Sequence, residues 1–408
     1  MLEISCLRDT PVAILVAAFI LVGASASPMW AQSPATGETS GQVPSSALTK
    51  TEAEQALKDA WLGLRNSRQE ASRKTLDSGV VEALGQKMPI WKTTRGERPA
   101  TGHSLWISLH GGGNAPAAVN DQQWKNQQHL YAPAEGIYVA PRAPTNTWNL
   151  WHEAHMDELL SQLIAHFALT EDIDTNRVYI MGYSAGGDGV FQLAPRMADR
   201  WAASAMMAGH PGDAHPDNLR NTPFGLFMGA KDGAYDRNRH AHEWQDKLRG
   251  LAEVTPGRWP HMVRIYEGLG HWMERKDAEA VPWMAASRRD PRPREIIWRQ
   301  DDVLHRRFAW LATDEPVAGT RCTGSIQEQR ITLELSPQQK SLTLRLDDQL
   351  VNLDEDVTVL LGERELFKGR IPRSKDVIEK TLMERSDKND VFTAELKLPL
   401  PPPAVEGR

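Results

Sequence analysis

The chain is organised around residues 176–189, which read NRVYIMGYSAGGDG. Arg177 begins an apolar run that is typical of a strand, and the small residues after Ser184 are able to start a helix. A Gly-x-Ser-x-Gly turn between a strand and a helix holds the serine oxygen clear of the backbone, and its glycines avoid collisions in a strained turn. Ser184 is therefore the predicted nucleophile of a covalent reaction.

A second stretch has the composition that such a nucleophile needs. Residues 104–109 predict a strand, and it runs directly into His110 and the glycines Gly111, Gly112 and Gly113. Glycines let backbone N–H groups come close to a substrate oxygen, as an oxyanion hole requires. The candidate donors are the backbone N–H groups of Gly111 or Gly112, together with that of Ala185 beside the serine.

An acid and a histidine follow later in the chain. A predicted strand at residues 222–229 precedes Asp232, and another at residues 262–266 precedes His271. A histidine can accept the serine proton and return it to a leaving group, while a carboxylate fixes its tautomer. Asp236 and Asp213 remain alternatives to Asp232, because each also follows a predicted strand.

With serine, acid and histidine in this order, the chain resembles the α/β-hydrolase serine esterases. From residue 105 to about residue 283 it resembles, more narrowly, the group of polyhydroxybutyrate depolymerases, feruloyl esterases and acetylxylan esterases. The alternation of strands with helices, such as the helical pattern at 157–169, independently indicates an α/β fold with a doubly wound, mostly parallel sheet. The resemblance implies a Ser-Asp-His triad that cleaves carboxylic esters without a cofactor.

Other polar and aromatic residues near these motifs are more ambiguous. Tyr183 flanks the serine, and Trp148 and Trp151 follow a strand end, so all three are candidates for substrate binding, although packing explains them equally well. His152 and His155 are three residues apart, where a zinc-protease helix needs a spacing of four. We predict no metal.

The N-terminal part predicts export. Residues 12–22 form an unbroken apolar run followed by small residues, which favours a signal peptide at 1–26, a flexible linker at 27–47 and a helical segment at 48–86. Thr51 and Glu54 have the spacing of a capping box. Cleavage would leave Cys322 as the remaining cysteine, which suits a bacterial periplasmic or secreted enzyme.

The rest of the chain, from residue 87 onward, divides by composition into two predicted domains. Residues 87–313 are predicted to form the α/β-hydrolase catalytic domain, and short alternating stretches at 320–400 predict a small C-terminal β-rich accessory domain. A helix is expected at 376–385, within that domain. Residues 288–294, which combine arginines with prolines, are interpreted as a solvated turn.

The sequence thus favours an exported serine ester hydrolase that acts on a small or polymeric ester, such as plant polysaccharide or polyester. A peptidase of the same fold and a non-catalytic polymer-binding protein are the alternatives. The formal net charge of −6 provides no basic footprint for nucleic acid, and no membrane association is expected after signal cleavage.

Overall fold

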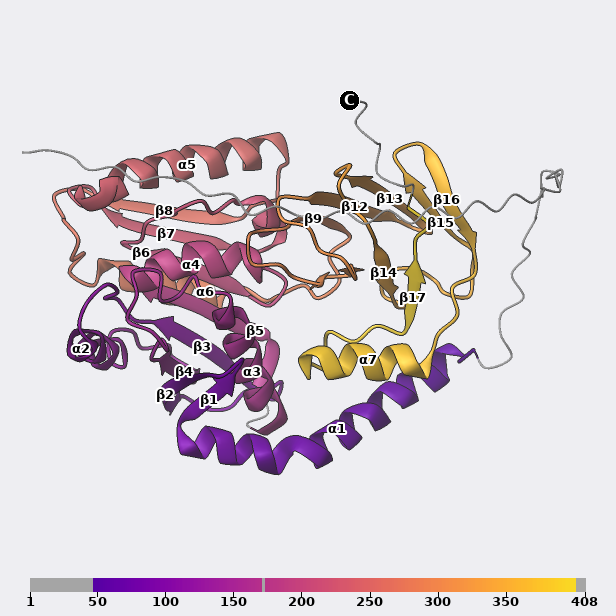
Figure 1. The fold of residues 1–408 in the computed structure, drawn as a ribbon, viewed down its shortest axis with the longest axis horizontal. Helices are drawn as coiled ribbons and strands as arrows, with labels where there is room; N and C mark the ends of the chain where they lie inside the picture. Colours follow the sequence, from indigo (N-terminus) through magenta and orange to yellow (C-terminus); the bar gives the residue numbers. More distant parts are fainter. Residues whose placement is uncertain (1–46, 171–172, 401–408) are drawn as a thin grey trace, which may run out of the picture. The chain divides into compact units, whose positions relative to one another are not determined.

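The computed structural model describes residues 47–170 and 173–400, which belong to one compact unit (Figure 1). The predicted signal peptide and nearly all of the predicted linker lie outside the described residues. Within the described ranges, none of the helices combines the length and the hydropathy needed to cross a bilayer.

The central sheet has the strand order β1-β2-β4-β3-β5-β6-β7-β8 (Figure 1). The first two pairings in this order are antiparallel, and every later pairing, from β4-β3 to β7-β8, is parallel. The strands are β1 (Val80–Ala83), β2 (Gln86–Arg95), β3 (His103–Leu109), β4 (Gly136–Pro141), β5 (Ile173–Tyr183), β6 (Ala203–Met207), β7 (Phe224–Gly229) and β8 (His261–Tyr266). The mostly parallel sheet predicted from the sequence is confirmed, and the carboxyl ends of its parallel strands share one edge.

Helices cover both faces of this sheet, because its strands are apolar on both sides. Along β3, Leu105 and Ile107 pack into the core beneath α3, α4 and α5, whereas Trp106 packs on the opposite face with residues of α2 and α6. The helices are α2 (Ala117–Gln127), α3 (His155–Thr170), α4 (Ala185–Arg196), α5 (Arg237–Val254) and α6 (Ala280–Ala285). The apolar stripe predicted for α3 is buried along its whole length, for example at Leu163 and Phe167.

The N-cap of the long N-terminal helix α1 (Lys50–Ser78) is Thr49, two residues before the expected cap Thr51. The capping box is formed by Thr49 and Glu52, whose carboxylate accepts from the Thr49 backbone N–H at 2.8 Å, and not by Thr51 and Glu54. Both pairs have the same spacing, so the sequence alone did not distinguish them. Buried side chains of α1, α3 and α7 (Lys375–Arg385) form one small apolar cluster, which joins the N-terminal helix to the C-terminal region.

Two further sheets follow among the described residues. One has the order β16-β15-β13-β12-β9, and the other has the order β10-β11-β14-β17. Their strands are β9 (Glu295–Arg299), β10 (Arg307–Phe308), β11 (Leu311–Ala312), β12 (Arg321–Gln327), β13 (Arg330–Leu335), β14 (Thr343–Leu346), β15 (Val357–Leu361), β16 (Arg364–Gly369) and β17 (Ala394–Lys397). The β-rich region therefore starts at Glu295, inside the range that the sequence analysis gave to the catalytic domain. Within it, β13 and β15 pair parallel.

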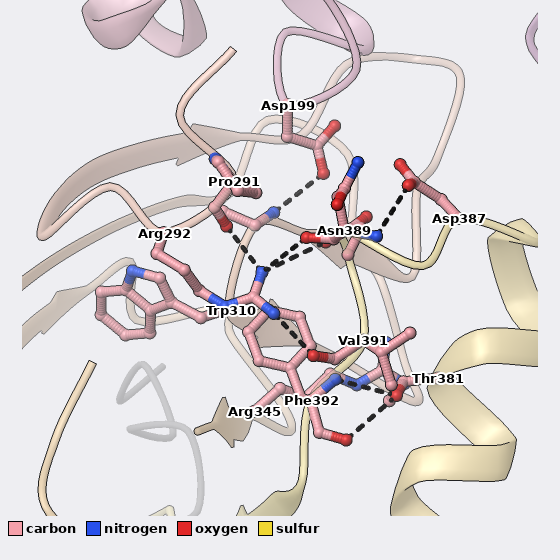
Figure 2. A network of polar contacts seen from close by, with 12 residues as sticks. Asp199, Pro291, Arg292, Trp310, Arg345, Thr381, Asp387, Asn389, Val391 and Phe392 are labelled. Carbon is pink, nitrogen blue, oxygen red and sulfur yellow. Dashed lines mark hydrogen bonds and ion pairs between the residues drawn. The ribbon is translucent and has the colours of Figure 1, made fainter. Parts of the chain in front are cut away.

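The prediction that residues 288–294 form a solvated turn is wrong, because two of the arginines in this segment are buried. Arg289 donates to Asp387 at 2.8 Å, and Arg292 donates to Asp347 at 2.5 Å. Figure 2 shows the Arg292 guanidinium held among backbone carbonyls, including that of Val391 at 2.6 Å. These partners lie far along the chain, so the local sequence of the turn did not reveal them.

Candidate active site

The serine turn joins β5 to α4 at the carboxyl edge of the sheet. Ser184 has φ 57° and ψ −121°, a left-handed conformation that is strained for a residue with a side chain. A Cβ atom on Gly182 would lie 2.2 Å from the Gly186 carbonyl oxygen, and one on Gly186 would lie 2.1 Å from the Leu109 carbonyl oxygen. Both glycines are therefore required for this turn to form against β3.

Three loops bring Ser184, His271 and Asp232 together. His271 follows β8, and its Nε2 lies 3.0 Å from Ser184 Oγ. Its Nδ1 lies 2.7 Å from Oδ2 of Asp232, which follows β7. A carboxylate can only accept, so Nδ1 carries the proton and Nε2 is left to accept from the serine hydroxyl. Asp232 is 2% exposed, whereas the His271 side chain is 43% exposed, so the chain of hydrogen bonds runs from a buried acid toward solvent.

The two alternative acids point elsewhere. The Asp236 side chain is exposed and pairs with Arg239 at 3.3 Å. Asp213 accepts from Gln192 at 3.0 Å. The structure thus places Asp232, and neither of the alternatives, at His271.

The glycine loop after β3 lies against the serine turn. A Cβ atom on Gly111 would lie 3.2 Å from Ser184 Cβ, so Gly111 is packed directly beside the serine. Gly112 has φ 111° and faces Asn120, whose Oδ1 accepts from the Gly113 N–H at 2.8 Å. The Gly113 donor is therefore already used, which leaves Gly111 and Gly112 as the donors able to face a substrate.

His110 holds this loop in place, a role that the sequence analysis did not assign. Its Nδ1 lies 2.6 Å from the Gly111 carbonyl oxygen, and its Nε2 accepts from the Ala143 N–H at 3.1 Å. Burial lowers the pKa of His110 from 6.5 to about 4, so the ring is neutral and donates from Nδ1. The sequence feature that could have indicated this role is the position of His110 between a predicted strand and three glycines.

The predicted substrate-binding residues lie in different environments. Trp148 is 68% exposed. Trp151 is fully buried and donates to the His110 carbonyl at 2.9 Å, so its predicted contact with substrate is withdrawn. Tyr183 is also buried, and its hydroxyl donates to the His271 carbonyl while accepting from the Met273 N–H at 3.3 Å. Tyr183 therefore anchors the loop that carries His271.

Asp188, in the first turn of α4, adds a carboxyl close to these loops. It accepts from the His210 N–H at 2.6 Å, and burial raises its pKa to about 6 despite the opposing effects of that hydrogen bond and of Arg237.

No group of three or more His, Cys, Asp and Glu side chains in the described ranges is arranged to hold a metal ion.

The mostly parallel sheet, the helices on both of its faces and the serine turn after β5 define the fold as an α/β-hydrolase. No family model matches the chain. It is similar to feruloyl esterase B of Thermothelomyces thermophilus, with 30% identity over 175 residues, and to feruloyl esterase B of Neurospora crassa, with 28% identity over 186 residues. These alignments cover 40% and 42% of this chain.

The chain spans only 57% and 60% of the lengths of these two relatives. Among solved structures, a ferulic acid esterase matches half of this chain and 95% of its own, with 17% identity and a TM-score of 0.37. The curated relatives confirm the resemblance to the esterase group that the motifs indicated.

Proposed function

We propose that the chain is a serine hydrolase of carboxylic esters, with Ser184 as nucleophile, His271 as general base and acid, and Asp232 as the acid that orients His271. The observation that carries this proposal is the unbroken chain of hydrogen bonds from Ser184 Oγ to His271 and on to Asp232, at 3.0 and 2.7 Å. A serine in a strained turn, a histidine in its reactive tautomer and a buried acid together suit covalent acyl transfer.

In the proposed reaction, Ser184 Oγ forms a bond to the ester carbonyl carbon while its proton moves to His271 Nε2. The carbonyl electron pair moves onto oxygen, and it returns as the bond to the alcohol oxygen breaks. His271 gives its proton to the departing alcohol. Water then attacks the acyl-enzyme with His271 as base, so that the acid is released and Ser184 regains its proton.

The tetrahedral oxyanion needs preorganised donors beside Ser184. We assign this role to the backbone N–H of Ala185 and to that of Gly111 or Gly112. Ala185 is the first residue of α4, whose N-terminus favours negative charge, and Gly111 packs against the serine. The hydrogen bond from His110 to the Gly111 carbonyl supports this assignment, because it fixes the orientation of that peptide.

For the substrate we propose an acyl ester of plant polysaccharide, with a polyester as the second candidate. The proposal follows the names of the relatives, which are feruloyl esterases. Trp148, which is largely exposed on the loop after β4, offers a face on which a sugar or an aromatic acyl group can stack. We also propose export to the periplasm or the medium, on the basis of the apolar run at residues 12–22.

The test compares the purified protein with Ser184→Ala on p-nitrophenyl acetate, methyl ferulate and acetylated xylan. Wild type is expected to hydrolyse at least one of these, and Ser184→Ala is expected to lose about 10⁴-fold or more of that turnover. Their relative kcat/KM values identify the acyl group. Folded wild type that hydrolyses none of the three, or Ser184→Ala that matches wild type, would contradict the proposal.

A further inference from the structure

A cavity of about 870 Å³ lies at the end of α4 remote from Ser184. Its walls come from α3, from the segment that follows α4, from residues 302–307 and from the C-terminal region. Ser184 precedes the first residue of α4 and Arg200 follows the last, so a helix about 18 Å long separates the serine from this cavity. We call it the Arg200 cavity.

Arg200 is the unusual residue in this wall. It is 3% exposed, and within the described part of the chain its guanidinium has neither a hydrogen bond nor an ion pair, with Nη2 fully buried. Burial and the nearby Arg385 together lower the pKa of Arg200 to about 10, against the opposing effects of Asp387 and Asp390, and the group stays charged at neutral pH. A buried cation without a partner is costly, because its lost hydration is not replaced.

The neighbouring carboxylates do not supply that partner, because other arginines already occupy them. Asp199 pairs with Arg385 at 2.7 Å, and Asp387 pairs with Arg289 at 2.8 Å. The further pairs are Asp390 with Arg307 at 2.6 Å, Glu384 with Arg345 at 2.6 Å, and Asp157 with Arg196 at 2.5 Å and with His305 at 2.8 Å. Figure 2 shows Asp199 and Asp387 within the network of hydrogen bonds and ion pairs in this region.

We propose that the Arg200 cavity binds a small molecule that carries an oxyanion, a carboxylate or a phosphate, on the Arg200 guanidinium. A guanidinium N–H donates a charge-assisted hydrogen bond to either group. The volume is within the range of small-molecule sites and exceeds that of a bare ion. The wall also carries Glu158 and Asp302 among cations such as Lys380, so its charge is mixed and a ligand of one or two charges is favoured over a polyanion. This inference is independent of the proposed ester hydrolysis.

The test is calorimetric titration of the full-length protein with inorganic phosphate and with acetate, at constant ionic strength set by sodium chloride. Wild type is expected to bind at least one of the two with a single site. Arg200→Gln is expected to weaken that binding about tenfold or more, since a hydrogen bond to a charged group accounts for at least that factor. Arg306→Gln is the matched control, because it removes an exposed arginine from the wall of the same cavity. This control is expected to bind within about threefold of wild type.

Thermal melting gives a second measurement on the same proteins. Arg200→Gln should melt within a few degrees of wild type without ligand, because Arg200 has no partner in the described chain to lose. The stronger ligand should raise the melting temperature of wild type and not that of Arg200→Gln. Arg200→Lys keeps the charge but replaces the planar guanidinium with a strongly hydrated ammonium, and it is expected to bind more weakly than wild type even if Arg200→Gln does not fold.

A preference for phosphate or for acetate identifies the ligand class. Failure of wild type to bind either ion up to about 50 mM, a concentration that would detect very weak sites, overturns the proposal. Binding that survives unchanged in Arg200→Gln or Arg200→Lys overturns it as well.

Discussion

The two ends of helix α4 are built in different ways. At its N-terminal end, Ser184 owes its position to residues next to it in the sequence, namely the glycines of a strand-to-helix turn. Beyond its C-terminal end, Asp199 pairs with Arg385, which lies 186 residues further along the chain. The first end is therefore specified by local backbone requirements, and the second by charges that only the folded chain brings together.

This difference has energetic consequences. A substitution of Ser184 or His271 should remove chemistry while leaving the fold, because the His271 side chain is 43% exposed and packs little into the core. A substitution in the buried ion pairs beyond the C-terminal end of α4, which we call the charged contact, should destabilise the fold. These pairs join Asp199 and Asp390 to Arg307 and Arg385. Removing one partner of a buried ion pair leaves the other charge buried and unpaired, which destabilises the fold.

The largest expected effect follows from removing the C-terminal region. A chain that ends at Thr313 lacks the partners of β9 and β11 and the α7 side chains that pack on α1, so it should not fold. Circular dichroism and limited proteolysis of the purified fragment provide the measurement. A fragment that melts cooperatively and keeps its esterase activity would instead establish residues 320–400 as a separate accessory domain.

The second prediction concerns the acid. Asp232→Asn should lower kcat by about 10⁴-fold, because an amide in place of the carboxylate leaves His271 in the wrong tautomer. Asp236→Asn is the matched control four residues along, and its exposed side chain should leave kcat within about threefold of wild type. Steady-state kinetics on one soluble ester decide between them, and the opposite ranking would transfer the role to Asp236.

The third prediction tests the charged contact. Asp390 is buried between Arg307 and Arg385, which lower its pKa, and Asp390→Ala should cost about 3–5 kcal/mol of unfolding free energy. Asp314→Ala, which removes an exposed ion pair with Lys397, should change stability far less. Urea denaturation at pH 7 measures both. Equal stability of the two variants would mean that the buried pairs do not secure this contact.

The fourth prediction uses His110, which belongs to the N-terminal end of α4 through the glycine loop. Its pKa is lowered in the folded protein, so its contribution to stability is full above pH 6.5 and is lost as the pH falls toward 4. The loss at pH 4 is about 3 kcal/mol. His110→Gln cannot take up this proton, so its stability should fall less between pH 7 and pH 4. Parallel acid-induced losses in both proteins would contradict the buried neutral imidazole.

Sequence reasoning worked where a motif has a fixed backbone consequence. The serine turn, the strands that precede Asp232 and His271 and the apolar stripe of α3 all follow from local spacing. It failed where a neighbour distant in sequence decides the outcome. Nothing near Arg289 or Arg292 indicates a buried carboxylate partner, and the strand at 295–299 became visible only with its pairing to β12.

Within the candidate site, backbone positions were easier to anticipate than side-chain environments. Trp148 and Trp151 share one loop and one residue type, yet one is exposed and the other fills the space beside Gly189. Their periodicity does not separate them, because the loop is irregular. Tyr183 likewise required knowledge of the His271 loop, which lies 88 residues further along the chain.

Everything proposed for the N-terminal end of α4 depends on Ser184 as the nucleophile. Incubation of the folded protein with a serine-directed fluorophosphonate, followed by peptide mass spectrometry, tests it most directly. We expect one adduct on Ser184 in wild type, much slower labelling in His271→Ala and none in Ser184→Ala. Labelling of a different residue, or labelling of Ser184 at the same rate without His271, would contradict it.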